Sequence, residues 1–179
     1  MFRLISFSAA VLFMGTLAFA EVVNFAPAGF LVRHETTIDA PADKVYTALT
    51  SGVGSWWSSE HTYSQDSKNL SIDARPGGCF CEKLPNGGGV RHMTVVFASP
   101  GHLLRMTGAL GPLQESGIAG SMTWSLTSSA TTTKVVLSYS VGGYMQGGFE
   151  KIAPIVDAVL GEQFNRFKNF VETGKPVVK

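Results

Sequence analysis

Three residues of the sequence carry side chains suited to acid–base chemistry: His34, His92 and Glu82. Imidazole titrates near neutral pH, and partial burial brings a carboxyl group toward the same range, so each could transfer a proton inside a cavity. Buried polar side chains usually have structural partners, so a structural role is the favoured interpretation of the two histidines. They are the catalytic candidates if the protein is an enzyme, and otherwise no catalytic residue is expected.

A larger set of residues is suited to holding an apolar molecule. Most are aromatic or methionine side chains on faces expected to point inward or to lie at the ends of a cavity. The candidate ligand-binding residues are Trp56, Trp57, His92, Met106, Trp124, Tyr139, Tyr144, Phe149, Ile152 and Val156. Core packing is the alternative for each aromatic residue, since large rings dominate protein cores. Replacing Trp124 by alanine is expected to weaken binding, and Tyr144, which has glycine pairs on both sides, is expected to lie in a mobile loop that gates the cavity.

Other chemical motifs are missing from the sequence. The four histidines show no metal-binding spacing, and no Gly-x-Ser-x-Gly nucleophile elbow occurs. Gly87-Gly88-Gly89 lacks the Lys-Ser/Thr that follows a phosphate loop, and its Pro-Asn lead-in is typical of a turn. We therefore expect no metal and no cofactor. A formal net charge of +1 without a basic stripe argues against nucleic acid as a partner.

Cys79 and Cys81 are separated by one residue of an expected strand, so their side chains point to the same face. The favoured interpretation is a pair of small buried hydrophobic residues. A disulfide and a soft-metal site are the alternatives. An extended strand holds such a pair near the upper limit of the distance for bridging, and a metal would need further ligands that no nearby zinc spacing supplies.

The elements that must position these residues follow from hydrophobic periodicity. Alternation over residues 30–39 predicts a first strand, and residues 39–43 begin a helix with Pro41 in its first turn and Asp39 as its cap. A short helical turn at residues 54–58 follows. Further strands are expected at residues 69–75, 79–84, 90–98, 102–108, 118–127 and 133–141, and a long helix at residues 149–172.

This order predicts one α+β domain over residues 30–174, with a leader at 21–29 and a tail at 175–179. A curved antiparallel sheet would wrap around the long C-terminal helix, and two short helices after the first strand would close one end. Such an arrangement encloses a space between sheet and helix, and small molecules bind in concave, mostly apolar spaces of this kind.

The first 20 residues have the pattern of a cleavable signal peptide. Arg3 precedes an apolar stretch, and Ala18-Phe19-Ala20 forms a small-x-small site, which predicts cleavage before Glu21. An uncleaved membrane anchor is the alternative, although the apolar run is shorter than a spanning helix needs. Cleavage would leave equal numbers of basic and acidic residues and no further membrane span. The protein is therefore expected in the periplasm or outside the cell.

Several short motifs occur in the order and spacing typical of one superfamily: residues 38–46 (IDAPADKVY), Trp56-Trp57, residues 76–82 (PGGCFCE), residues 99–103 (SPGHL) and residues 133–137 (TKVVL). The chain resembles the START-like superfamily, also called SRPBCC or polyketide cyclase/dehydrase-like, over residues 30–173. The resemblance implies the helix-grip fold. The branch is most similar to proteins like the activator of a heat-shock chaperone ATPase, whose activity should not carry over to an exported protein.

Three functions remain as hypotheses. The first is an exported module that binds a small hydrophobic or amphipathic ligand, such as a lipid, a polyketide or an aromatic compound. The second is a cyclase or dehydratase that folds a polyketide-like or aromatic substrate in the same cavity and uses His92, His34 or Glu82 for proton transfer. The third is a protein-interaction domain with a filled core. A cavity that contains none of the three titratable residues would exclude the second hypothesis.

Overall fold

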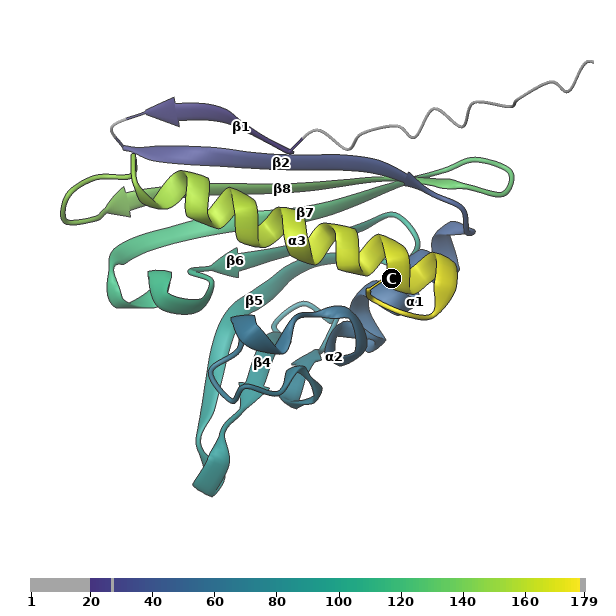
Figure 1. The fold of residues 1–179 in the computed structure, drawn as a ribbon, viewed down its shortest axis with the longest axis horizontal. Coiled ribbons are helices and arrows are strands. Elements are labelled where there is room, and N and C mark those ends of the chain that lie inside the picture. The colour runs from purple at the N-terminus through teal and green to yellow at the C-terminus, as the bar shows by residue number, and fades with distance from the viewer. Residues whose placement is uncertain (1–19, 27, 178–179) are drawn as a thin grey trace, which may run out of the picture.

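The computed structural model describes residues 20–26 and 28–177, and its main feature is an antiparallel sheet with a long helix lying across one face (Figure 1). The sheet order within these residues is β1-β2-β8-β7-β6-β5-β4-β3. The strands are β1 (Ala20–Ala26), β2 (Gly29–Ile38), β3 (Leu70–Ile72), β4 (Cys79–Lys83), β5 (Gly89–Ser99), β6 (Leu103–Gly108), β7 (Gly117–Ser128) and β8 (Thr133–Tyr144). The helices are α1 (Ala42–Ser51), α2 (Val53–Trp56) and α3 (Ile152–Thr173). The predicted helix-grip architecture is confirmed.

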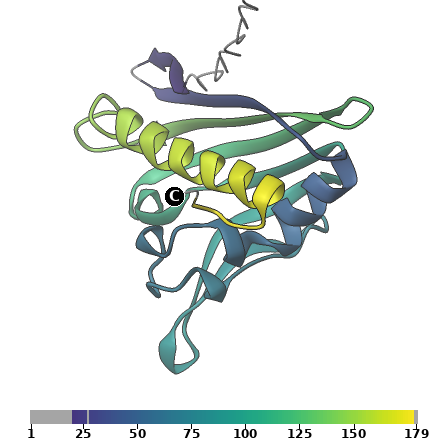
Figure 2. The ribbon, with the colours of Figure 1, turned by 45° about the vertical axis from the view of Figure 1, so that its right-hand side comes forward.

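The two short helices after β2 lie near the C-terminal end of α3 in both views (Figure 1, Figure 2). Helix α1 buries Val45, Tyr46 and Leu49, which are spaced so that they share one face of a helix. Its start differs from the prediction, because the N-cap is Pro41 and no side chain caps the helix. The predicted cap, Asp39, instead donates its backbone N–H to Glu172 of α3 at 3.0 Å.

Helix α3 runs along the concave side of the sheet and presents its apolar face to it. Pro154 lies in the first turn, where a missing backbone N–H breaks no helical hydrogen bond. Gly174 ends the helix in the left-handed conformation with φ 76°, which glycine adopts without steric cost. The observed helix starts three residues later and ends one residue later than the predicted helix, residues 149–172.

Strand β1 comprises Ala20, predicted as the last residue of the signal peptide, and residues 21–26 of the predicted leader, where no strand was expected. It pairs antiparallel with β2, from Ala20 opposite His34 to Ala26 opposite Gly29, and it forms one edge of the sheet. The predicted signal peptide, except for Ala20, lies outside the described residues. No helix within the described part of the chain is both long enough and apolar enough to cross a membrane.

Cys79 and Cys81 form a disulfide on the outer face of β4, where both are only partly buried. Their Cα atoms are 5.4 Å apart, within the usual bridging range. The favoured interpretation of two free, buried cysteines is therefore wrong. Phe80 and Glu82, which alternate with the cysteines, point to the inner face and are buried.

An aromatic cluster fills the space between the sheet and the C-terminal half of α3. Its members are Trp56 of α2, Trp124 of β7, and Phe164 and Phe167 of α3, each at most 2% exposed. The ring centroids of Trp56 and Phe167 are 5.2 Å apart, and those of Trp124 and Phe167 are 5.3 Å apart with nearly perpendicular planes. Edge-to-face packing of this kind is favourable for aromatic rings and leaves little free volume.

Candidate functional site

A pocket of about 440 Å³ opens beside the N-terminal half of α3. Apolar side chains make up most of its wall. The wall residues are Trp57, Glu60, His61, Thr62, Tyr63, Leu70, Phe80, His92, Leu110, Gly111, Pro112, Leu113, Ile152, Ile155, Val156, Val159 and Leu160. Volume and lining fall within the range of sites that hold small organic molecules.

Four parts of the chain, far apart in sequence, form this wall. One face of α3 contributes five aliphatic residues between Ile152 and Leu160. The segment 57–63, after α2, forms a second side, and Leu70, Phe80 and His92 of strands β3, β4 and β5 form a third. The loop 110–113 between β6 and β7 completes the pocket. Only the folded chain brings these segments together.

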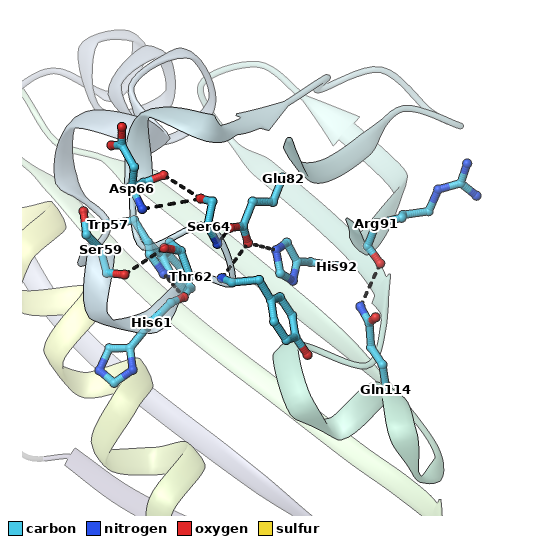
Figure 3. A network of polar contacts seen from close by, with 11 residues as sticks. Trp57, Ser59, His61, Thr62, Ser64, Asp66, Glu82, Arg91, His92 and Gln114 are labelled. Atoms are coloured by element: carbon cyan, nitrogen blue, oxygen red, sulfur yellow. Dashed lines mark hydrogen bonds and ion pairs between the residues drawn. The ribbon is translucent and has the colours of Figure 1, made fainter. Parts of the chain in front are cut away.

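A buried histidine–glutamate pair stands at the sheet side of the pocket. Nε2 of His92 lies 3.0 Å from Oε2 of Glu82, and both side chains are at most 5% exposed (Figure 3). The Glu82 carboxylate also accepts backbone N–H groups from Tyr63 at 3.2 Å and from Ser64 at 2.5 Å. The carboxylate therefore joins the sheet to the segment that forms the opposite wall.

A β-bulge explains how His92 reaches the pocket. Phe80 pairs with Met93, but Cys81 pairs with Arg91, so His92 is an extra residue on β5. Strict alternation would put His92 and Met93 on opposite faces of the sheet, whereas both are buried. Bulges of this kind redirect side chains, and no local sequence pattern predicts this one.

Burial and hydrogen bonding act in opposite directions on the two partners. Burial lowers the pKa of His92 below 6.5, and the hydrogen bond and charge of Glu82 only partly compensate. Burial alone would raise the pKa of Glu82, but the hydrogen bonds that it accepts from Ser64, Tyr63 and His92 outweigh that effect and lower the pKa. At neutral pH the pair is thus a carboxylate beside a neutral imidazole.

The segment 57–64 contains one 3-10 turn, Ser59–His61, and is otherwise irregular, and other elements hold it in place. Gln163 of α3 accepts the backbone N–H of Ser58 at 2.8 Å, and Arg166 of α3 donates to the carbonyl of Trp56 at 2.9 Å. Within the segment, the indole N–H of Trp57 donates to the carbonyl of His61 at 3.0 Å (Figure 3). These bonds satisfy backbone groups that neither helix nor sheet pairs, and they fix the wall of the pocket.

The loop 110–113 is fixed from two sides. The Tyr139 hydroxyl accepts the backbone N–H of Leu110 at 3.1 Å and donates to the carbonyl of Gly108 at 3.2 Å. Burial raises the pKa of Tyr139 to about 12, although the hydrogen bond from Leu110 opposes this shift. Gln114 donates to the carbonyl of Arg91 at 2.8 Å (Figure 3). Tyr139 therefore supports the pocket without lining it.

The second acid–base candidate, His34, lies away from the pocket. Its Nε2 atom is 3.1 Å from Oδ1 of Asp157 on α3, and its ring packs against Phe164 with centroids 5.8 Å apart. Burial lowers the pKa of His34, and Asp157 opposes the shift. Gly161 leaves room for the ring, because a Cβ atom at that position would lie 3.0 Å from the imidazole and the imidazole would have to shift. His34 therefore joins β2 to α3.

The ten predicted ligand-binding residues fall into two groups. Trp57, His92, Ile152 and Val156 line the pocket. The other six do not: Trp56, Met106, Trp124, Tyr139 and Phe149 are buried in the core, and Tyr144 is 74% exposed at the end of β8. Core packing, the alternative interpretation, describes the five buried residues. Tyr144 is also not a loop residue beside the pocket, because β8 extends to include it.

Most wall residues were not predicted, including Tyr63, Phe80, Leu110, Ile155 and Val159. One sequence signal was available, because Ile155 and Val159 lie one helical turn apart on α3, beside the predicted Ile152 and Val156. No pattern marks the segments 57–63 and 110–113, which have no periodicity. Among the described residues, no cluster of three or more His, Cys, Asp and Glu side chains is placed to hold a metal ion.

The sequence matches a protein-family model over residues 30–172. The family is described as polyketide cyclase / dehydrase and lipid transport. Because the match spans most of the chain, the protein belongs to this family, as the resemblance to the SRPBCC superfamily predicted. No curated protein matches the chain.

Solved structures agree on the fold. A conserved protein of unknown function from Enterococcus faecalis, EF2215, has a TM-score of 0.61 and 18% identity over 88% of this chain and 78% of its own. The Aha1 dimer from Colwellia psychrerythraea has a TM-score of 0.59 and 21% identity over 81% of this chain and 98% of its own. DynU16, a putative protein in the dynemicin biosynthetic locus, has a TM-score of 0.58 and 21% identity over 82% of this chain and 48% of its own. At these identities the likeness concerns the fold.

Proposed function

We propose that this protein binds a small hydrophobic or amphipathic molecule in the pocket between α3, the sheet and the segments 57–63 and 110–113. The observation that carries the proposal is the pocket itself, about 440 Å³ in volume with a mostly apolar wall. Apolar surface of this kind gains free energy when a ligand removes it from water. Membership of a family described by cyclase, dehydrase and lipid-transport functions supports a ligand of this class.

The pocket mouth also favours an apolar ligand. Tyr63 is 47% exposed and Ile155 is 57% exposed, and both belong to the wall. Large apolar side chains exposed together at a concave site mark binding surfaces more often than ordinary surface. A bound molecule would cover part of both residues.

A pocket-filling substitution tests this function. Val159→Trp places an indole in the pocket from α3, whereas Ala158→Trp adds the same side chain at an exposed neighbouring position on that helix. The probe is N-phenyl-1-naphthylamine, a neutral apolar dye whose fluorescence rises in apolar sites. We expect Val159→Trp to weaken dye binding at least about tenfold, because the indole and the dye compete for the same volume. Equal binding by both variants would refute the assignment of this pocket.

Export is the second part of the proposal. The apolar stretch and the Ala18-Phe19-Ala20 site support cleavage before Glu21, and the Cys79–Cys81 disulfide is compatible with an oxidising compartment. Cleavage would leave Glu21 as the new N-terminus, next to the start of β1. Expression of the full chain in a Gram-negative host, followed by fractionation and N-terminal sequencing, is expected to give a periplasmic protein that begins at Glu21. An intact N-terminus in the membrane fraction would contradict this.

One observation favours a second candidate function, a cyclase or dehydratase. His92 is in the pocket wall and its imidazole is held by an ionised carboxylate, which is the arrangement of a general base and its orienting group. Such a base would remove a proton from carbon next to a substrate carbonyl. Deuterium exchange of the α-protons of 2-acetylnaphthalene, followed by NMR, should then be faster with the wild type than with His92→Gln. Equal rates would leave binding as the function.

A further inference from the structure

The imidazole of His92 has one nitrogen without a partner. Nε2 faces Glu82, but Nδ1 is buried and has no hydrogen-bond partner among the described residues. The side chain is 5% exposed and belongs to the pocket wall, but Nδ1 itself has almost no accessible surface, and the rings of Tyr63 and Phe80 pack against the imidazole. A ligand hydroxyl therefore reaches Nδ1 only when one of these rings shifts, and Tyr63 is 47% exposed. A buried polar atom without a partner costs free energy, so such an atom at a binding site indicates where a ligand supplies the missing hydrogen bond.

Glu82 determines which kind of hydrogen bond Nδ1 can make. The carboxylate accepts from Tyr63 and Ser64, so it is an acceptor toward His92 as well. Nε2 must therefore carry the proton, and Nδ1 of the neutral ring presents a lone pair. A group that meets Nδ1 has to be a hydrogen-bond donor.

The other polar side chains of the wall have partners or face water. His61 lies 3.0 Å from Glu162 at an exposed position, and the Thr62 hydroxyl donates to the carbonyl of Ser59 at 2.7 Å. Glu60 is exposed. His92 is thus the wall residue whose buried side chain can add one directed polar contact to an apolar pocket.

We infer that the pocket selects apolar or aromatic molecules that carry a hydroxyl group, which donates a hydrogen bond to Nδ1 of His92. The inference rests on the proposed binding function and narrows its ligand class. Glu82 is the positioning residue, because it fixes the tautomer of His92 without lining the pocket.

Three naphthalenes of similar shape separate hydrogen bonding from apolar contact. 2-Naphthol can donate, 2-methoxynaphthalene can only accept, and 2-methylnaphthalene can do neither. Their dissociation constants would be measured by displacement of N-phenyl-1-naphthylamine. We expect the wild type to bind 2-naphthol about 3- to 10-fold more tightly than 2-methoxynaphthalene, the effect of one buried hydrogen bond. In His92→Phe this ratio should fall to about one.

Glu82→Gln tests the positioning role. Oε1 of Glu82 accepts the backbone N–H of Ser64 at 2.5 Å, and Oε2 accepts that of Tyr63 at 3.2 Å. The amide oxygen should keep the shorter bond from Ser64 and give up the one from Tyr63, so that the amide nitrogen faces His92. An amide N–H can donate only to an unprotonated Nε2, which moves the imidazole proton to Nδ1. The variant should then gain affinity for 2-methoxynaphthalene relative to the wild type. A merely structural Glu82 would weaken all three compounds equally.

The tautomer of the wild type can be read without any substitution. ¹⁵N-resolved histidine spectra are expected to show His92 neutral and protonated at Nε2 near neutral pH, and protonated at Nδ1 in Glu82→Gln. Protonation of the wild type at Nδ1 would overturn the inference, and so would equal preference for the hydroxyl in wild type and His92→Phe. If none of the three naphthalenes displaces the dye, the proposed function fails as well. Tight binding of all three without a hydroxyl preference refutes this inference alone.

Discussion

The space between α3 and the sheet is filled with side chains at one end and open at the other, although helix and sheet border both ends. At the C-terminal half, Phe164 and Phe167 meet Trp56 and Trp124, and the rings leave no room. At the N-terminal half, α3 presents branched aliphatic side chains, and a pocket of about 440 Å³ remains. Side-chain reach decides the difference, since an aromatic ring extends further from a helix than valine or isoleucine does.

The two buried histidines repeat this contrast. Each has one ring nitrogen without a hydrogen-bond partner among the described residues, Nε2 in His34 and Nδ1 in His92. The surroundings differ: His34 Nε2 lies 3.1 Å from Oδ1 of Asp157 and its ring packs against Phe164, whereas His92 belongs to the pocket wall. Histidine therefore packs in the core of one region and lies in the pocket wall of the other. Variants in each region, compared by stability and by dye binding, test whether the two regions are separate.

The largest effect should come from the filled region. Trp124→Ala removes the ring at the centre of the aromatic cluster and is expected to lower the free energy of unfolding by about 3–5 kcal/mol. Urea denaturation measures this loss, with Trp124→Phe as a milder control. Dye affinity of the folded variant should stay unchanged, which replaces the expectation from sequence that binding would weaken. Lost affinity in a folded variant would show that the two regions are not separate.

A smaller loss of stability should follow acidification. Burial lowers the pKa of both His34 and His92 in the folded protein, so the unfolded chain takes up protons first as the pH falls below about 6.5. The free energy of unfolding should therefore decrease as the pH falls below about 6.5, and Glu82, whose pKa is also lowered, adds a loss below about pH 4.5. Urea titrations at several pH values measure both steps.

Single substitutions assign the first step to the two regions. His34→Gln and His92→Gln should each remove part of the decrease that begins below about pH 6.5, since each takes away one histidine with a lowered pKa. An unchanged slope in either variant would exclude that histidine as a contributor.

Removal of the disulfide should lower the free energy of unfolding by less than Trp124→Ala does. It links residues two apart, so it restricts the unfolded chain little, and the loop-entropy model gives a contribution of less than about 2 kcal/mol. The double variant Cys79→Ser/Cys81→Ser is expected to bind the dye as the wild type does, because both cysteines lie on the outer face of β4. Thermal unfolding of the variant, with reduced wild type as the comparison, checks this. Loss of dye binding would show that the bridge holds Phe80 and Glu82 in place.

The smallest effect is expected at Tyr144. Its side chain is 74% exposed and lies outside the pocket wall. Tyr144→Ala should change the free energy of unfolding by no more than about 0.5 kcal/mol and leave dye affinity and binding rates as they are. Stopped-flow mixing measures the rate of dye entry. A faster or slower rate in the variant would support the predicted gating role of Tyr144.

The sequence alone determined the order of elements from β2 to α3, the fold class and the family, but it did not predict the edge strand β1. Alternation gave the strands, three- and four-residue spacing gave α3, and Gly174 gave its end, because these signals are local and repeat along the chain. Four of the ten predicted ligand-binding residues line the pocket, and two of those four, Ile152 and Val156, belong to the helical pattern.

Only the tertiary structure decided where the pocket lies and which polar group meets it. The bulge that turns His92 inward depends on the pairing of β5 with β4. Gln163 and Arg166 of α3 hold the segment 57–63, and Tyr139 of β8 and Arg91 of β5 hold the segment 110–113 and the adjoining Gln114. Whether an inward aromatic side chain fills a core or lines a cavity depends on what lies opposite it. Sequence periodicity records the face on which a residue lies, whereas the volume left between two faces is a property of the packed molecule.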